Sequence, residues 1–312
     1  MAKRRGTPIL NFKASPVRVR VPATSANLGP GFDSLGLALD WYDDLVAQVI
    51  DEPVIEIDLI GEGADTLPRD QKHLVIKAMH AAFDAMGERP EGIALVCANH
   101  IPHARGMGSS AAAIVGGIEL ARNLVVGGHQ LLPHAEALKI AATLEGHVDN
   151  VAAALLGGLT IAWGDADNAK SLRIKPHPEL RPIICIPEGS VNTKKARAAL
   201  PESISHVDAS FNIGRSALLV AALTEEPEYL FEATEDKVHQ EARKSVMSKS
   251  FKLMNALRDA GYAAVISGSG PSVLVLTTEF VEENVRDIAG EDFDTQLVKV
   301  SLLGAHSVPL SN

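Results

Sequence analysis

A glycine-punctuated loop that runs directly into an alanine-rich helix constrains the fold more than any other segment of this chain. Apolar residues 93–97 predict a strand, residues 102–110 form a loop of small residues, and the run AAAIVGGIELAR at 111–122 predicts a helix. The first turn of a helix carries unpaired N–H groups and a partial positive charge. The segment therefore indicates a domain of strands and helices that can hold phosphate at a helix N-terminus.

This loop is compatible with a kinase. In that hypothesis its amides hold phosphate groups, and a hydroxyl at the helix start ligates the magnesium ion that accompanies a nucleotide. The sequence contains neither a Gly-x-x-x-x-Gly-Lys-Ser/Thr motif nor a His-Arg-Asp motif. The common P-loop and protein-kinase architectures are therefore excluded.

Two other interpretations of the loop stay open. Gly106, Gly108 and Ala111 fit the GxGxxA dinucleotide fingerprint, but residues 102–105 separate them from the strand, and no acidic residue lies between 124 and 132. The segment also fits a plain glycine turn in which Ser109 caps the helix. The loop alone does not decide among the three.

The segment EGHVDN at 145–150 follows another predicted helix and places two carboxylates around a turn. One carboxylate can hold a metal ion while the other faces an acceptor hydroxyl. Carboxylates are also common at helix ends where they contact only water and have no catalytic role. His147 has no second histidine at metal-ligand spacing, which favours a packing or capping role.

Two further loops carry glycines at places where backbones can approach closely. The segment PATSANLGPGFD at 22–33 is too long for a hairpin turn and contains Asn27 and Asp33, which can orient a polar substrate. The segment GSGPS at 268–272 lies between two predicted strands and indicates close approach to another loop or to phosphate. The structural alternatives are a capped surface loop and a tight turn.

The chain of 312 residues is long enough for two domains. The polar stretch at 164–172 is the best boundary, and it predicts domains of 1–168 and 169–312. Beyond it the expected order is strand, helices, two strands, helix and a last strand at 296–302, which is typical of a ferredoxin-like split βαβ domain and of the α+β class. Residues 1–15 are expected to be a frayed basic terminus.

The composition excludes several classes of function. A net charge of −10 and an aromatic content of 4% argue against nucleic acid or an anionic membrane as a partner. Cys97 and Cys185 belong to no cysteine–histidine cluster, so neither a disulfide framework nor a structural zinc site is expected. The sequence shows no secretory signal and no apolar run that could span a bilayer. We expect a cytoplasmic protein, with a homodimer as the default oligomeric state.

Taken together and in this order, the four loops resemble those of the GHMP small-molecule kinases. The likeness is closest to the branch whose members phosphorylate L-homoserine, because PATSANLGPGFDSLG at 22–36 and EGHVDN at 145–150 are similar to signatures of that branch. The resemblance covers the chain from residue 17 to about residue 276. It implies a two-domain GHMP-kinase fold, with an N-terminal ATP-binding βαβ domain whose helices lie over the sheet and a ferredoxin-like C-terminal domain.

The resemblance also implies roles for individual residues. Residues expected to contact the cofactor ATP are Pro102, Arg105, Gly106, Met107, Gly108, Ser109, Ser110, Ala111, Ala112, Gly268, Ser269 and Gly270. Residues expected to hold Mg²⁺ are Ser110 and Glu145. Residues expected to bind L-homoserine are Asn27, Asp33, Asp149, Asn150, Thr193, Arg197 and Arg243, with Asp149 and Arg197 catalytic. The two arginines would clamp the carboxylate of the amino acid, a role that suits the guanidinium fork.

Four departures from the family pattern accompany the resemblance. Met107 replaces a leucine of similar volume, Val148 replaces a proline, and Glu241-Ala242 replaces Pro-Tyr in the segment that carries Arg243. His73 stands where many relatives have asparagine near the adenine.

The reaction that the resemblance implies is transfer of the γ-phosphoryl group of ATP to the side-chain hydroxyl of L-homoserine, a step in threonine biosynthesis. Asp149 would either remove the proton of that hydroxyl or orient it. The alternatives are a related kinase that acts on a different small alcohol, and a binding or regulatory protein of the same fold without catalysis. The fingerprint at 106–111 leaves a nicotinamide enzyme as a third alternative.

Overall fold

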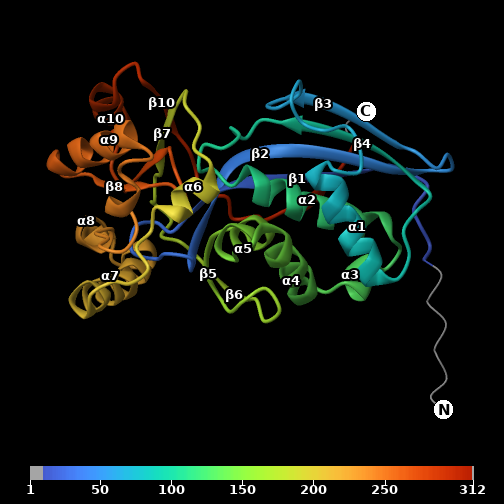
Figure 1. Ribbon diagram of the computed structural model, residues 1–312, viewed down its shortest axis with the longest axis horizontal. Coiled ribbons are helices and arrows are strands. Elements are labelled where there is room, and N and C mark those ends of the chain that lie inside the picture. The colour runs from blue at the N-terminus through green and yellow to red at the C-terminus, as the bar shows by residue number, and fades with distance from the viewer. Residues whose placement is uncertain (1–9, 311–312) are drawn as a thin grey trace, which may run out of the picture.

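The computed structural model describes residues 10–310, whose strands form one large and one small sheet (Figure 1). The large sheet has the order β11-β1-β2-β4-β3, and β5 pairs with both β2 and β6. Only β3 and β4 are parallel; the other pairs are antiparallel. Its strands are β1 (Val17–Ala26), β2 (Leu35–Ile50), β3 (Ile55–Gly61), β4 (Gly92–Asn99), β5 (Leu159–Trp163), β6 (Lys170–Ile174) and β11 (His306–Val308).

Helices cover one face of the large sheet (Figure 1). They are α1 (Leu74–Met86), α2 (Ser109–Leu124), α3 (Gly128–Leu131), α4 (His134–Glu145) and α5 (Asp149–Leu156). Helix α1 connects the parallel strands β3 and β4, which need a crossover, so the expected βαβ unit is confirmed. A Cβ added to Gly117 would lie 2.4 Å from the carbonyl oxygen of Val75, so this glycine lets α2 pack closely on α1.

The small sheet has the order β10-β7-β9-β8 and is antiparallel throughout. If the four strands are numbered along the chain, their order across the sheet is 4-1-3-2. This order confirms the predicted ferredoxin-like arrangement. Its strands are β7 (Ile183–Pro187), β8 (Ala263–Ile266), β9 (Val273–Leu276) and β10 (Phe293–Leu297). The helices of this part are α6 (Thr193–Ala198), α7 (His206–Thr224), α8 (Leu230–Ala233), α9 (Ser248–Asp259) and α10 (Glu282–Ala289), with 3₁₀ turns at Pro227–Tyr229 and Glu241–Arg243.

Two predicted boundaries are wrong. The loop expected from Pro22 begins later, because a register shift after Pro22 lets residues 23–26 pair with β2. The strand expected at 296–302 is shorter and earlier, because the chain leaves the small sheet after Leu297. Val300 then forms a bridge with Leu39 of the large sheet.

The sheets are not separated at residue 168. Residues 164–169 join β5 to β6, and β11 returns to the large sheet beside β1. The predicted domain bounds, 1–168 and 169–312, stay a prediction. Residues 1–9 of the terminus expected to fray lie outside the described residues, whereas Leu10 is buried and Phe12 packs edge-on against Phe83. No helix within 10–310 has the length and apolar character needed to cross a membrane.

Candidate active site

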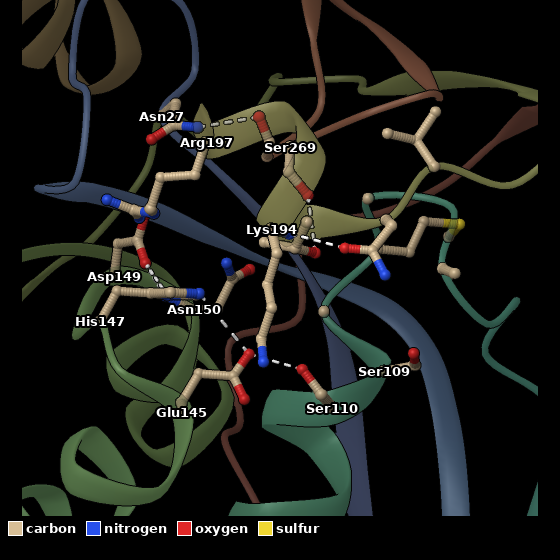
Figure 2. A pocket seen from close by; sticks show the side chains of 18 of the residues that line it. Asn27, Ser109, Ser110, Glu145, His147, Asp149, Asn150, Lys194, Arg197 and Ser269 are labelled. Atoms are coloured by element: carbon tan, nitrogen blue, oxygen red, sulfur yellow. Dashed lines mark hydrogen bonds and ion pairs between the residues drawn. The ribbon is translucent and has the colours of Figure 1, made fainter. Parts of the chain in front are cut away.

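A cavity of about 450 Å³ lies where the loops of the two sheets meet (Figure 2). It is lined by residues from six segments that are far apart in the sequence. Of the residues predicted for the site, those that line it are Asn27, Asp33, Gly106, Met107, Gly108, Ser109, Ser110, Glu145, Asp149, Asn150, Thr193, Arg197, Arg243, Gly268 and Ser269. The structure therefore brings together most of the residues that the resemblance selected.

The glycine loop reaches α2 through two left-handed residues. Gly106 and Gly108 have φ values of +75° and +68°, which side chains other than glycine rarely adopt. A Cβ at Gly106 would lie 2.3 Å from the carbonyl oxygen of Ser267, and one at Gly108 would lie 1.9 Å from the hydroxyl of Thr24. This packing fixes the loop and leaves the first-turn N–H groups of α2, which begins at Ser109, without intrahelical partners.

Ser110 and Glu145 form an oxygen pair on one side of the cavity. The Ser110 hydroxyl donates to Oε1 of Glu145 at 2.5 Å. Hydroxyl and carboxylate oxygens are ligands that Mg²⁺ prefers, so this pair fits the ion that was predicted here. No group of three or more His, Cys, Asp or Glu side chains within residues 10–310 is arranged to hold a metal ion. An ion here would need further oxygens, such as those of phosphate groups.

Asp149 begins α5 and is only 2% exposed. Its Oδ1 accepts the N–H of Asn150 at 2.8 Å and lies 2.8 Å from Nδ1 of His147. The other imidazole nitrogen, Nε2, lies 3.7 Å from Oε1 of Glu145. Burial lowers the pKa of His147, but the hydrogen bond with Asp149 and the charges of both carboxylates outweigh burial and raise it. His147 therefore links the two carboxylates of the site, whereas the sequence favoured a packing or capping role.

Arg197 and Asp33 form a two-bonded ion pair at another wall of the cavity. Nη1 of Arg197 donates to Oδ2 of Asp33 at 3.0 Å, and Nη2 donates to Oδ1 at 2.9 Å. The carboxylate that accepts both bonds raises the pKa of Arg197. Helix α6, which carries the arginine, starts at the N-cap Asn192, whose side chain accepts the N–H of Lys194 at 2.9 Å.

Arg243 is buried to 2% exposure and still lines the cavity. Within residues 10–310 its guanidinium bonds to the carbonyls of Ala196 and Gly268 and to Nδ1 of His239, and it forms no ion pair with a carboxylate. Burial, followed by the charge of Arg197, lowers the pKa of Arg243. A guanidinium remains protonated even so, which leaves beside the cavity a positive charge that no carboxylate of residues 10–310 pairs directly.

Hydrogen bonds between the loops hold the remaining predicted residues. Nδ2 of Asn27 donates to the carbonyl of Gly268 at 2.9 Å, and Oδ1 of Asn27 accepts the N–H of Asp33 at 3.0 Å. The hydroxyls of Thr193 and Ser269 lie 3.2 Å apart. These bonds tie the first loop and α6 to the loop at 268–270.

Five predicted cofactor contacts do not line the cavity: Pro102, Arg105, Ala111, Ala112 and Gly270. Arg105 donates to the carbonyls of His103, Pro187 and Glu188. Its guanidinium therefore binds backbone oxygens of the protein. The side chains of Ala111 and Ala112 are fully buried inside α2. Gly270 packs against Met247. Arg105 and Gly270 therefore hold their loops through contacts outside the cavity.

Sequence reasoning missed several residues of the cavity: Ala104, His147, Val191, Asn192 and Lys194. Figure 2 shows the Lys194 side chain extending toward Ser110 and Glu145. Its signal in the sequence was its place three residues before Arg197, about one helical turn away. The resemblance used only the threonine and the arginine of that segment.

A second cavity, of about 250 Å³, adjoins the first. Ser109 and Ser110 line both. Its walls are mainly apolar: Leu45, Leu67, Leu74, Val75 and Ala113. The polar residues at its edge are Asp43, His73, Asn99 and His103.

Comparison with known proteins agrees with this geometry. Family models for the GHMP kinases N terminal domain and the GHMP kinases C terminal match residues 73–158 and 218–295. The homoserine kinase of Streptomyces coelicolor is 49% identical over 300 residues, covering 96% of this chain and 97% of its own length. That of Mycobacterium tuberculosis is 44% identical over 264 residues, covering 83% of each.

Solved structures agree as well. The homoserine kinase structure from Cytophaga hutchinsonii superposes with a TM-score of 0.81 at 27% identity, covering 96% of this chain and 99% of the other. A structure described as a putative homoserine kinase from Listeria monocytogenes has a TM-score of 0.74 at 28% identity, covering 95% and 100%. The chain belongs to the homoserine kinases of the GHMP kinase family.

Proposed function

We propose that the protein transfers the γ-phosphoryl group of ATP to the side-chain hydroxyl of L-homoserine and releases O-phospho-L-homoserine and ADP. One observation carries this proposal. A single cavity contains the glycine loop at a helix N-terminus, the Ser110–Glu145 oxygen pair, the buried Asp149 and two arginines. These are the groups that a metal-bound triphosphate and a small zwitterion require side by side.

The triphosphate would lie against the loop at 106–110. The transition state of phosphoryl transfer is loose, so the protein mainly positions the reactants and neutralises charge. Mg²⁺, held by Ser110 and Glu145, would supply positive charge at the phosphate oxygens when bound. Lys194 reaches toward the same place from the opposite wall, so its ammonium would face the transferred group (Figure 2).

The amino acid would lie near α6. L-homoserine carries an ammonium and a carboxylate at neutral pH, and the Asp33–Arg197 pair offers one charge to each. Arg243 adds a buried positive charge that lacks a carboxylate partner within the described chain. We assign the carboxylate of homoserine to the two arginines and its ammonium to Asp33.

Asp149 would face the acceptor hydroxyl. Both hydrogen bonds that the described residues make to its carboxylate fall on Oδ1, which leaves Oδ2 for the substrate. The hydrogen bond with His147 fixes the position of Oδ1 and therefore the direction in which Oδ2 points. We assign to Oδ2 the hydrogen bond that orients the hydroxyl or removes its proton.

A coupled assay of ADP release tests this proposal. The assay contains ATP, Mg²⁺ and one of four acceptors: L-homoserine, L-serine, L-threonine or mevalonate. We expect the kcat/KM for homoserine to exceed that for each of the other acceptors, and Glu145→Gln to abolish most of the release. A higher kcat/KM for mevalonate or threonine would assign the protein to a different alcohol. Binding of ATP without release for any acceptor would indicate a protein without catalysis.

A further inference from the structure

Within residues 10–310, neutral groups rather than a carboxylate hold the guanidinium of Arg243 in place. Its Nε donates to the carbonyl of Ala196 at 3.2 Å, and its Nη1 donates to Nδ1 of His239 at 2.9 Å. A longer contact of 3.5 Å joins Nη1 to the carbonyl of Gly268. No residue in the described part of the chain accepts a hydrogen bond from Nη2. The donors of Nη2 therefore remain for a ligand in the cavity that Arg243 lines.

The contacts of His239 select one tautomer of its ring. The second ring nitrogen, Nε2, lies 2.8 Å from the carbonyl oxygen of Gly29. A carbonyl oxygen only accepts, so Nε2 carries the proton. A guanidinium only donates, so Nδ1 presents its lone pair to Arg243. Both contacts are therefore satisfied by the neutral imidazole with its proton on Nε2.

The backbone that carries His239 is fixed by Asp236, and the side chains of both residues are fully buried. Oδ2 of Asp236 accepts the N–H groups of His239 and Gln240 at 3.0 and 2.8 Å, and Oδ1 accepts that of Val238 at 3.1 Å. Nε2 of His239 lies 3.7 Å from Oδ2 of Asp236, which is too far for a hydrogen bond. The carboxylate therefore anchors the chain and does not take the ring proton.

The neutral ring leaves the charge of Arg243 available. Burial lowers the pKa of His239, the charge of Arg243 lowers it further, and the carboxylates of Asp236 and Asp33 oppose the shift. A carboxylate in the place of the ring would neutralise Arg243 and repel an anionic ligand. An imidazole that only accepts fixes the direction of the guanidinium without either effect.

Phe32 packs the ring of His239 beside both arginines of the site. The two rings stack with their centroids 5.0 Å apart and their planes at 26°. The guanidinium carbons of Arg243 and Arg197 lie 5.4 and 5.9 Å from the centroid of Phe32, within the range of cation–π attraction. The ring of His239 therefore packs as well as accepts a hydrogen bond, and a test has to separate the two.

We propose that His239 is a positioning residue of the amino-acid site, whose neutral imidazole directs the Arg243 guanidinium toward the carboxylate of the acceptor without neutralising it. His239 acts through Arg243 and does not itself line the cavity. The inference rests on the proposed function, because it takes the carboxylate of homoserine to lie at Arg243. Loss of the acceptor nitrogen should therefore weaken binding of the amino acid and leave ATP unaffected.

The tautomer is measured first, in the unmodified protein without substrate. Long-range ¹⁵N–¹H spectra of the imidazole rings distinguish a protonated from an unprotonated ring nitrogen. We expect His239 to carry a proton on Nε2 and none on Nδ1 on both sides of pH 6.5, the ordinary pKa of histidine. A proton on Nδ1 at neutral pH would overturn the proposal, because a donor would then face Arg243.

Three substitutions then separate the hydrogen bond from the packing. His239→Phe keeps a stacked ring without an acceptor, whereas His239→Asn can place its amide oxygen where Nδ1 lies. His239→Asp has the shape of His239→Asn but adds a charge that neutralises Arg243. We expect the KM for homoserine to rise about 10-fold with Phe and with Asp but least with Asn, at an unchanged KM for ATP. Equal KM values for homoserine in the three variants would overturn the proposal.

A double substitution tests whether the effect passes through the guanidinium. In an Arg243→Ala protein, His239→Phe should raise the KM for homoserine no further. The same rise with and without Arg243 would show that His239 acts elsewhere, and the proposal would fail. Failure of the proposed function looks different. An unmodified protein that does not phosphorylate homoserine would contradict that function, while the tautomer, measured without substrate, still decides how His239 holds Arg243.

Discussion

Arg197 and Asp33 lie 164 positions apart in the sequence and form a two-bonded ion pair in the active-site cavity. One comes from α6 and the other from the loop between β1 and β2. An amino-acid zwitterion carries the same two charges. Its carboxylate can replace Asp33 as the partner of Arg197, and its ammonium can replace Arg197 as the partner of Asp33. The pair would therefore hold the two halves of the proposed amino-acid site in register.

Replacing Arg197 tests this directly. Because a hydrogen bond to a charged group contributes about 1.5–3 kcal/mol, we expect Arg197→Ala to raise the KM for homoserine about 10- to 100-fold. The KM for ATP should stay the same. Steady-state kinetics with both substrates measures the difference, and Arg197→Lys serves as the control that keeps the charge but loses the fork. Equal activity of the unmodified protein toward 3-aminopropan-1-ol, which lacks the carboxylate, would refute the assignment.

Asp149 is the residue that we assign to the acceptor hydroxyl. General base catalysis contributes about 10²- to 10⁴-fold, so Asp149→Asn should lower kcat by at least about 100-fold. Single-turnover measurements of phosphoryl transfer give the value. A variant that keeps nearly full kcat would exclude the base role and leave only orientation of the hydroxyl.

The link between His147 and Asp149 predicts a titration shift. The Asp149 and Glu145 carboxylates raise the pKa of His147 above its ordinary value of 6.5. The stabilisation from this pairing is therefore fully present below pH 6.5 and is lost as the pH rises through the higher folded value. Imidazole NMR signals of the unmodified protein should titrate above 6.5, and Asp149→Asn should move the midpoint down. An unchanged midpoint would show that the hydrogen bond does not hold in solution.

The sequence predicted the elements whose signals are local. The alanine-rich run at 111–122 predicted a helix, and α2 spans Ser109–Leu124. The order of the small sheet followed from the sequence of strands and helices alone. The clustering of the four loops followed from resemblance, because their separate motifs are too short to exclude ordinary turns.

What the sequence could not predict depends on tertiary neighbours. Arg105 lies inside the glycine loop and was assigned to phosphate, yet three backbone carbonyls take up its guanidinium. The carbonyls of Pro187 and Glu188 are brought near it only by folding. Asp43 had no motif of its own, since the N–H groups of His100 and Ile101 that its carboxylate accepts reach it only in the folded chain. Propensity and spacing contain no information about such partners.

Lys194 should act on the transferred phosphoryl group. We expect Lys194→Met to weaken binding of a non-hydrolysable ATP analogue about 10-fold, from the loss of one charge-assisted hydrogen bond, and to leave ADP affinity unchanged. Lys194→Arg should restore part of the difference. Lys195→Met is the matched control, because Lys195 lies on the same helix and does not line the cavity. Equal loss of affinity for the analogue and for ADP would argue against contact with the terminal phosphate.

Asp43 should make stability depend on pH. Burial raises the pKa of Asp43 from 3.8 to about 6, so the folded state favours the protonated acid. Its stabilising contribution is present below pH 3.8 and is lost as the pH rises through about 6. Between pH 4 and 7, the free energy of unfolding should fall by about 2 kcal/mol relative to Asp43→Asn. Urea titrations of both proteins at the two pH values measure this, and a constant difference would show that the carboxylate is not desolvated.

A crystal structure with L-homoserine, Mg²⁺ and a non-hydrolysable ATP analogue shows directly whether one cavity holds both substrates. We expect the terminal phosphates at the amides of residues 106–110, with Ser110 and Glu145 at the ion. We also expect the hydroxyl of homoserine beside Asp149 and its carboxylate at Arg197 and Arg243. A nucleotide bound away from the glycine loop, or a homoserine that does not reach Asp149, would contradict this arrangement.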